Sequence, residues 1–303
     1  MNIADNNLKR RIDKVVIPVA GLGTRFLPAS KAVPKEMFTI VDMPIIQYAI
    51  NEAREAGIEN FVFVTGRNKA VIEDYFDLQP QLKKNLIKHK KENVLSILEE
   101  NHLQAGRISF TPQRNPLGLG HAVWCARNII GNEPFALLLP DMLMQAQEGC
   151  LFSMMKMYNK VGGNIIAAGE CSQEDIRKYG IITRGNPIGD GFKIAKMREK
   201  PSVKETSSQF FINGRYILQP EIFRVLENQE MGINGEFQIT DAILSLAQQQ
   251  PLYGYQFEGK IFDCGSKEGF IAANIAFALS REDTRPFLQT IIKDLLKKDP
   301  LSL

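Results

Sequence analysis

Short apolar runs alternate with amphipathic segments and glycine-bearing loops along the first part of this chain. Val15–Ala20 and Phe61–Thr65 are apolar on both faces, which is typical of strands buried inside a sheet. Pro18 is an exception within the first run, because proline normally argues against a central strand. From Pro44 to Ala56 apolar residues recur at helical spacing, and Gly57 follows where a helix would end. This order of strand, helix and strand predicts a parallel sheet with right-handed crossovers.

The same patterns continue toward the end of the chain. Further strands are predicted at Arg107–Thr111, Phe135–Leu139, Asn164–Glu170, Tyr179–Arg184, Phe192–Arg198, Gln209–Leu218 and Leu252–Asp263. Helices are predicted at Asn68–Phe76, His121–Ile130, Leu151–Tyr158, Pro220–Glu227, Glu236–Gln248, Lys267–Leu279 and Pro286–Lys297, with a polar helical arm over Gln81–Leu103. The sequence therefore predicts an α/β fold. It has a Rossmann-like mixed, mostly parallel central sheet with helices on both faces.

Composition narrows the class of protein without identifying it. With 303 residues, 44% of them hydrophobic, the chain can bury a sizeable core. A net charge of +3 is too small to indicate nucleic acid as a partner. We expect no signal peptide and no membrane segment, because no apolar run approaches the ~20 residues of a span. The cysteines form no CxxC pair, so we expect free thiols and a cytoplasmic protein.

A glycine-bearing loop follows the first strand and carries two cations. In Gly21, Leu22 and Gly23 the backbone can approach an anion and direct free N–H groups toward it. Arg25 then offers a planar fork for phosphate oxygens, and Lys35 offers a point charge. Together these features indicate a polyphosphate site. An ordinary turn is the alternative for any Gly-Leu-Gly sequence.

Two better-known phosphate loops do not match this one. Phe26 stands where a dinucleotide fingerprint requires a third Gly or Ala. The second strand ends in Thr65-Gly66-Arg67, without an acidic residue for a ribose. The loop also lacks the GKS or GKT of P-loop proteins. The sequence thus argues against both a dehydrogenase and a P-loop nucleotidase.

Polar residues at the ends of other predicted strands are further candidates. Asp141 and Asp263 each follow a strand, where open α/β sheets bind ligands, and could share Mg²⁺ with phosphate oxygens. Each could instead cap a helix or a turn. Glu199 and Lys200 could bind sugar hydroxyls and a phosphate, or form an exposed strand end. Gln113, beside a second glycine loop, could read the polar edge of a nucleobase.

Several longer motifs follow one another from about Lys14 to Leu279. They are Ile17–Met37, Pro44–Ile58, GLGHAVWCAR (Gly118–Arg127), LLPD (Leu138–Asp141), EKP (Glu199–Pro201), GRYIL (Gly214–Leu218), FQITDAI (Phe237–Ile243) and FDCGSKEGF (Phe262–Phe270). In this order they resemble the motifs of the sugar-nucleotide pyrophosphorylases, and among these the bacterial UTP–glucose-1-phosphate uridylyltransferases. The resemblance implies the nucleotide-diphospho-sugar transferase fold.

The resemblance also implies a role for each candidate. The nucleotide is expected to lie against Ala20, Gly21, Leu22, Gly23, Gln113 and Gly118. The glucose is expected to lie against Gly180, Glu199 and Gly214. The catalytic cations would be Arg25, Lys35 and Lys200, and Mg²⁺ would be bound by Asp141 and Asp263. The chain departs from the family pattern in two segments near the expected sugar site. The strand Ile194–Arg198 is more basic than usual, and the loop Asn186–Gly191 is short.

The implied activity is transfer of a uridylyl group from UTP to glucose 1-phosphate. Its nucleophile would be a phosphate oxygen that is already ionised at neutral pH, because the second pKa of a phosphate is about 6. No general base is needed, so the scattering of the three histidines is no objection. Two alternatives stay open. One is a catalytically silent relative that binds a nucleotide sugar and regulates a partner, and the other is a thymidylyltransferase, since uracil and thymine differ by one methyl.

We also expect a particular organisation of the chain. Residues 1–13 would be an N-terminal extension, 14–280 the nucleotidyltransferase domain and 281–303 a C-terminal helical tail. The resemblance implies a homodimer or homotetramer whose other partners are the small-molecule substrates.

Overall fold

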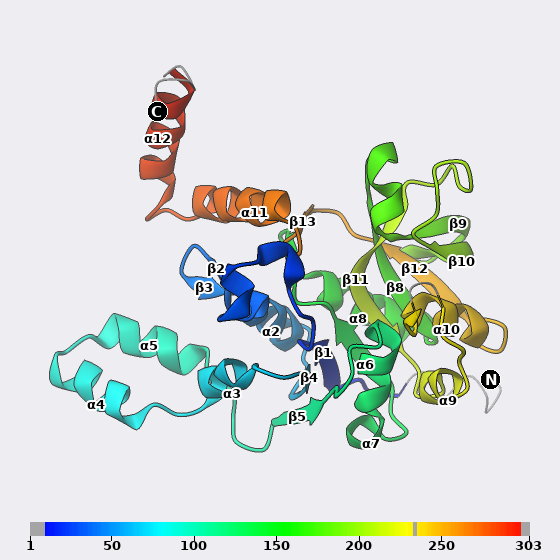
Figure 1. Cartoon of the computed structure of the whole chain (residues 1–303), viewed down its shortest axis with the longest axis horizontal. Helices are drawn as coiled ribbons and strands as arrows, with labels where there is room; N and C mark the ends of the chain where they lie inside the picture. The colour runs from blue at the N-terminus through cyan, green and yellow to red at the C-terminus, as the bar shows by residue number, and fades with distance from the viewer. Residues whose placement is uncertain (1–9, 233–234, 298–303) are drawn as a thin grey trace.

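A nine-stranded sheet runs through the centre of the protein (Figure 1). The computed structural model describes residues 10–232 and 235–297. The strand order is β5 (Ile108–Pro112), β4 (Asn60–Thr65), β1 (Lys14–Pro18), β6 (Phe135–Leu138), β11 (Phe210–Leu218), β8 (Asn164–Glu170), β12 (Leu252–Gln256), β10 (Gly191–Glu199) and β9 (Gly180–Ile188). The first four strands are parallel, whereas β11 runs antiparallel to both β6 and β8. The mixed sheet predicted from the sequence is confirmed.

Helices cover both faces of this sheet (Figure 1). Val15 and Ile17 of β1 pack into a core with α2 (Ile45–Glu55) and α8 (Cys150–Val161). Val16 points to the other face, where α6 (Leu119–Cys125), α9 (Ile222–Glu227) and α10 (Ile239–Leu246) pack. Successive side chains of a strand alternate between faces, so a strand covered on both sides must be apolar throughout. The remaining helices are α3 (Ala70–Phe76), α4 (Pro80–Lys88), α5 (Glu92–Glu100), α7 (Arg127–Ile130), α11 (Lys267–Ser280) and α12 (Arg285–Lys297).

Pro18 is tolerated because it lies at the carboxyl end of β1. The N–H of the next residue, Val19, donates to the Val64 carbonyl of β4 (2.8 Å). Backbone N–H groups of a strand point alternately to its two neighbours, so the nitrogen of Pro18 faces β6. Pairing of β1 with β6 extends only over Val15 and Val16. The missing N–H of Pro18 therefore removes no hydrogen bond from the sheet.

The segment Leu252–Asp263, predicted as strand material, is two strands in two sheets. β12 joins the central sheet, and β13 (Lys260–Asp263) pairs with β7 (Met142–Gln145). Sequence patterns did not predict β7. Its antiparallel pairing with β13 places Asp263 opposite Met142, one residue after Asp141. A second small sheet joins β2 (Thr39–Ile40) and β3 (Met43–Pro44).

Two helical segments stand away from the sheet (Figure 1). The predicted arm over Gln81–Leu103 is a hairpin of α4 and α5, broken at Lys90, whose φ is 53°. α12 projects beyond α11, on the same side of the view as that hairpin. The predicted N-terminal extension and C-terminal tail lie partly outside the described residues. No described helix is long and apolar enough to cross a membrane.

Candidate active site

The predicted site residues gather where the parallel strands end. The chain passes from β1 to β4 and β5 on one side and then crosses to β6 on the other. β1 and β6 are therefore neighbours at a topological switch point, where open α/β sheets bind ligands beyond the carboxyl ends of their strands. The loop after β1 carries Gly21 to Lys35, and the turn after β6 carries Asp141.

The loop after β1 is irregular and open to solvent. It continues through the short 3-10 helices η2 (Thr24–Phe26), η3 (Ala29–Lys31) and η4 (Lys35–Met37). Gly23 has a φ of 64°, the left-handed region that favours glycine, and its carbonyl accepts from Ser30 Oγ (2.7 Å). Gly21 and Leu22 are exposed. The loop thus presents backbone rather than packed side chains, as a phosphate loop requires.

Four charged side chains converge on the backbone of Gly265. A Cβ on this glycine would lie 2.9 Å from Asp263 Oδ1, 3.0 Å from Asp141 Oδ2 and 3.5 Å from Arg25 Nη1. Arg25 Nη1 also donates to the Gly265 carbonyl (3.3 Å). Lys35 Nζ lies 2.5 Å from Asp141 Oδ2. The fold therefore brings together four predicted residues that are widely separated in the sequence.

Asp141 and Lys35 hold each other in their charged forms. Burial would raise the pKa of the Asp141 carboxyl, but attraction to Lys35 and Arg25 outweighs burial and lowers that pKa. Burial would lower the pKa of the Lys35 ammonium, but Asp141 and Glu36 outweigh burial and raise it. Both side chains are therefore ionised across the neutral pH range.

Neither aspartate caps a helix. Asp141 lies in the turn between β6 and β7, and Asp263 is the last residue of β13. The N-cap of α11 is Ser266, whose Oγ accepts a backbone N–H (3.1 Å). Asp263 Oδ1 instead accepts the N–H of Gly265 (2.9 Å). The helix-cap alternative is thereby excluded for both aspartates, whereas Asp141 does lie in a turn.

Tyr179 connects Asp263 to the strands that carry the predicted sugar-binding residues. Its hydroxyl donates to Asp263 Oδ2 (3.1 Å), and its carbonyl accepts the N–H of Lys200 (3.1 Å). Its ring packs against Phe211, with 4.7 Å between the ring centroids. Burial and the charge of Asp263 raise the pKa of Tyr179. The hydroxyl therefore keeps its proton and remains a donor.

Gly180 and Glu199 are paired directly across β9 and β10. A Cβ on Gly180 would lie 3.1 Å from Glu199 Oε2, which also accepts from Thr240 Oγ1 (3.1 Å). Lys200 Nζ lies 3.5 Å from Glu199 Oε1, and its side chain is exposed. Lys200 has a φ of 41°, an uncommon conformation for a residue with a Cβ. The structure thus brings together three of the four residues predicted to bind glucose and its phosphate.

Gly214, the fourth, packs against the Asp141 turn instead. Its carbonyl accepts the Leu139 N–H (2.9 Å), and its φ is 83°. A Cβ there would lie 3.0 Å from the side chains of Leu139 and Met142. The described contacts of Gly214 are therefore with the turn that carries Asp141, rather than with Gly180 or Glu199.

Arg215, which the sequence analysis did not single out, braces the same turn from inside the protein. It is 1% exposed, and its Nε and Nη2 donate to the Glu52 carboxylate of α2 at 2.7–3.0 Å. Nη1 donates to the Leu139 carbonyl (2.9 Å) and Nη2 to the Met142 carbonyl (2.8 Å). These carbonyls lie on either side of Asp141. The only signal in the sequence was one charged residue within the mostly apolar run of β11.

The residues predicted to bind the nucleobase meet at the ends of β1, β4 and β5. The Gln113 N–H donates to the Thr65 carbonyl (2.7 Å), and Gln113 Nε2 donates to the Gly118 carbonyl (3.0 Å). A Cβ on Gly66 would lie 3.2 Å from the Ala20 carbonyl. The three strand ends are therefore in close contact, with Gln113 only 8% exposed between them.

A buried ion pair, also missed from the sequence, anchors the loop that carries Lys35. Glu36 is 1% exposed, and its Oε2 accepts from Lys69 Nζ (2.8 Å), between β4 and α3. Burial raises the pKa of Glu36, although Lys69 and Lys35 oppose that rise. The ion pair with Lys69 fixes the side chain of Glu36 in the interior. The adjacent side chain of Lys35 points the other way, toward Asp141.

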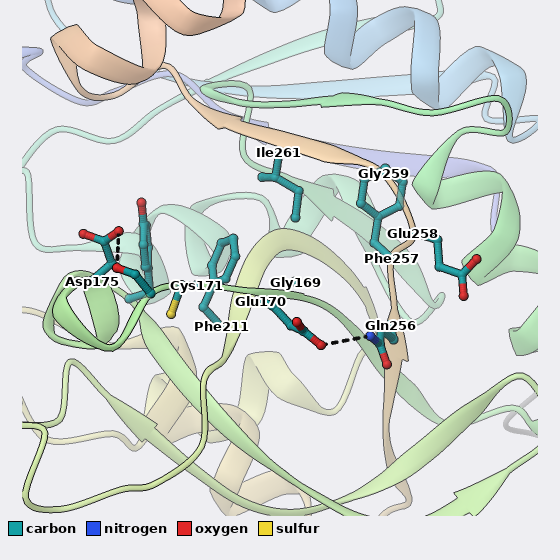
Figure 2. A pocket seen from close by; sticks show the side chains of 12 residues that line it. Gly169, Glu170, Cys171, Asp175, Phe211, Gln256, Phe257, Glu258, Gly259 and Ile261 are labelled. Carbon is teal, nitrogen blue, oxygen red and sulfur yellow. Dashed lines mark hydrogen bonds between the residues drawn. The ribbon is translucent and has the colours of Figure 1, made fainter.

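A cavity of about 490 Å³ is bordered by Phe211, Ile261 and the segment Gln256–Gly259 (Figure 2). Tyr179 and Phe211 line it, together with the carboxylates of Glu170, Asp175 and Glu258. None of the residues predicted from the sequence is among its lining residues. This cavity is therefore a neighbour of the site and not the site itself.

Comparison with known proteins agrees with the geometry. Residues 14–279 match the family model described as nucleotidyl transferase. The chain therefore belongs to the nucleotidyl transferase family. A curated UTP–glucose-1-phosphate uridylyltransferase of Bacillus subtilis (strain 168) is 44% identical over 292 residues, which cover 96% of this chain and 100% of the relative. Another, of Komagataeibacter xylinus, is 46% identical over 256 residues, or 84% of this chain and 90% of the relative.

The fold is also similar to solved structures of UDP-glucose pyrophosphorylases. A UTP-bound UGPase from Acinetobacter baumannii has a TM-score of 0.86 and 37% identity, covering 94% of this chain and 100% of that one. A UDP-glucose pyrophosphorylase complexed with UDP-glucose has a TM-score of 0.80 and 41% identity, covering 89% and 100%. Within the nucleotidyl transferase family, the chain groups with the UTP–glucose-1-phosphate uridylyltransferases.

Proposed function

We propose that this protein transfers the uridylyl group of UTP to glucose 1-phosphate, forming UDP-glucose and pyrophosphate. The observation that carries the proposal is the convergence of Arg25, Lys35, Asp141 and Asp263 around Gly265. Two cations and two carboxylates in one small volume suit two anionic substrates and a divalent cation. Relatives that share nearly the whole length of the chain carry this activity in their names.

The substrates would occupy the two halves of the site. The nucleotide would lie against the strand ends and loops that carry Ala20, Gly21, Leu22, Gly23, Gln113 and Gly118. The glucose would lie against Gly180, Glu199 and Gly214, with its phosphate held by Lys200. The contacts of Gly214 with the Asp141 turn support a position for this glycine at the boundary between sugar and metal.

The donor set at Gly265 fits Mg²⁺. Among residues 10–232 and 235–297, no group of three or more His, Cys, Asp or Glu is placed to hold a metal. The protein would therefore contribute only Asp141 and Asp263, whose nearest oxygens each lie within 3.0 Å of one point beside Gly265. Mg²⁺ is commonly held by one or two carboxylates, with phosphate oxygens and water completing the octahedron. Bound there, it would neutralise charge on the triphosphate.

The proposed uridylyl transfer requires no proton transfer by a side chain of the protein. An ionised phosphate oxygen of glucose 1-phosphate attacks the α-phosphorus of UTP, and the bond from that phosphorus to the leaving pyrophosphate breaks. Arg25 and Lys35 would hold phosphate oxygens and offset the charge that develops on pyrophosphate. Lys35 is ionised and directed by Asp141 before any substrate binds. The reaction is reversible, because pyrophosphate can attack UDP-glucose in the same geometry.

The proposal is tested by measuring UDP-glucose and pyrophosphate after mixing the purified protein with UTP, glucose 1-phosphate and Mg²⁺. We expect the two products in equal amounts, and we expect Asp141→Ala to abolish turnover. Asp190→Ala, which changes an exposed carboxylate in the turn between β9 and β10, is the matched control and should keep full activity. No pyrophosphate with any nucleoside triphosphate and hexose phosphate would refute the proposal.

Two other functions are separated by the same assay. Binding of UDP-glucose without turnover would indicate a silent regulatory relative, although all five charged residues of the proposed machinery are present in this chain. Comparison of kcat/KM for UTP and dTTP would identify a thymidylyltransferase. A single methyl is worth only ~1–3 kcal/mol of discrimination. The values of kcat/KM for UTP and dTTP could therefore be similar.

We also propose a cytoplasmic homodimer or homotetramer whose nucleotidyltransferase domain spans residues 14–280. Apolar side chains on α12 support self-association. Phe287 is 70% exposed, Leu295 52% and Leu296 81%. Adjacent exposed apolar side chains of this kind mark protein interaction surfaces.

A further inference from the structure

The amide of Gln113 is held in one orientation by two hydrogen-bond acceptors. Its Nε2 lies 3.0 Å from the Gly118 carbonyl and 3.1 Å from His121 Nδ1. An amide nitrogen can only donate, so His121 Nδ1 must be the unprotonated, accepting nitrogen. Turning the amide over would place its oxygen against both acceptors. The amide therefore makes two hydrogen bonds when Nε2 faces Gly118 and His121, and neither of them when it is turned over.

The imidazole of His121 is itself fixed in place. It stacks on Trp124 with ring centroids 6.0 Å apart and on Phe237 with centroids 6.2 Å apart, at interplanar angles of 24° and 29°. Burial and the charge of Arg127 lower the pKa of His121. The ring is therefore neutral at neutral pH and remains an acceptor toward Gln113. Cys125 Sγ, 4.0 Å from each ring nitrogen, is its other polar neighbour.

The oxygen of the Gln113 amide is left for a ligand. No donor among the described residues reaches Oε1, and this atom is absent from the buried polar atoms that lack a partner. Oε1 is therefore accessible at the ends of β1, β4 and β5. A nucleobase that meets this atom must offer a hydrogen-bond donor.

We infer that His121 is a specificity-determining residue that makes Gln113 select a pyrimidine whose N3 carries hydrogen. Uracil presents N3–H as a donor and fits Oε1, whereas cytosine presents N3 as an acceptor and opposes it. This inference rests on the proposed function for the placement of the base beside Gln113. Two acceptors that face each other in such a site leave both without a hydrogen bond, and this strongly disfavours binding of the wrong base. His121 touches neither the sugar nor the phosphates in this account, so it acts through Gln113.

The test measures kcat/KM for UTP and for CTP in the whole protein. His121→Phe keeps an aromatic ring on Trp124 and Phe237 but removes the acceptor, which frees the Gln113 amide to turn. We expect the UTP-to-CTP ratio to fall about tenfold or more, mostly because CTP improves. His121→Asn places an oxygen near the position of Nδ1 and should restore most of the ratio. Cys125→Ala is the matched control and should leave it unchanged.

Calorimetric binding of UMP and CMP to the unmodified protein keeps the inference independent of turnover and of the folding of the variants. We expect UMP to bind at least about tenfold tighter. Equal binding, or a UTP-to-CTP ratio that His121→Phe leaves intact, would overturn the role of His121. If no UDP-glucose forms but UMP is preferred and His121→Phe loses that preference, the proposed transfer fails and the role of His121 stands.

Discussion

Individual side chains at this site are held in place by other side chains that would not touch a substrate. Gly265 lacks a Cβ, which leaves room for the oxygens of Asp141 and Asp263 to approach one point. Tyr179 and the backbone of Gly265 each hold one oxygen of Asp263. Lys35 is directed by its ion pair with Asp141 and by the next residue, Glu36, whose side chain is buried against Lys69. Preorganised charges of this kind need no rearrangement at the moment of reaction.

Tyr179→Phe tests whether the orientation of Asp263 matters for the metal. The variant keeps the ring against Phe211 and removes only the hydroxyl that donates to Asp263. Loss of a partner that orients a metal ligand typically weakens metal binding ~10–100-fold. We expect that loss in a Mn²⁺ titration followed by electron paramagnetic resonance. Tyr75→Phe removes a hydroxyl that donates to Gln47 (3.1 Å) and is the control; metal binding equal in both variants would contradict the account.

The charged residues that gather beside Gly265 could be predicted from the sequence, whereas those behind them could not. Arg25, Asp141 and Asp263 stand beside glycines or at the ends of apolar runs, so local pattern marks them. Arg215 and His121 have meaning only through their partners. The partner of Arg215 lies 163 positions away in the chain, and no periodicity records such a contact.

The β6–β7 turn is the element on which the proposed metal site depends most. It carries Asp141, and the Arg215 guanidinium ties its two ends to α2 through Glu52. The carboxylate of Glu52 and three carbonyls, those of Leu139, Met142 and Gly214, accept from this buried guanidinium. This arrangement fixes the turn relative to both β11 and α2.

Arg215→Met should therefore reduce both stability and activity. Breaking a buried ion pair by removing one partner typically costs ~3–5 kcal/mol, because the remaining charge is left uncompensated. We expect a loss of this size in the free energy of unfolding measured with urea. Adding Glu52→Leu should recover much of that stability but not kcat. Full activity in the double variant would show that Arg215 serves stability alone and does not position Asp141.

The helices and strands also show where sequence patterns lose information. Burial on both faces made β1 recognisable, and the tolerance of Pro18 became clear only when β6 was seen to diverge from it. β7 was missed because four residues between two turns carry no periodicity of their own. It exists because β13, more than a hundred residues later, pairs with it.

The molecule as a whole is built on a nine-stranded central sheet whose strand order reverses between β1 and β6 (Figure 1). The parallel half supplies Gly21, Gln113 and Asp141 through the ends of β1, β5 and β6. The mixed half supplies Gly180 and Glu199 through its antiparallel strands β9 and β10, and β13 of a separate small sheet supplies Asp263. In the proposed reaction the two substrates would approach from the two halves and meet at Gly265. The fold class followed from the sequence because such a sheet needs apolar strands and intervening helices.

The central claim is that glucose 1-phosphate attacks UTP through its own phosphate. The most direct test uses glucose 1-phosphate with a radiolabelled phosphorus, unlabelled UTP, Mg²⁺ and the purified protein, with the products separated by anion-exchange chromatography. All transferred label should appear in UDP-glucose and none in pyrophosphate or free phosphate. Label released as phosphate or pyrophosphate, or UDP-glucose formed without label, would contradict it.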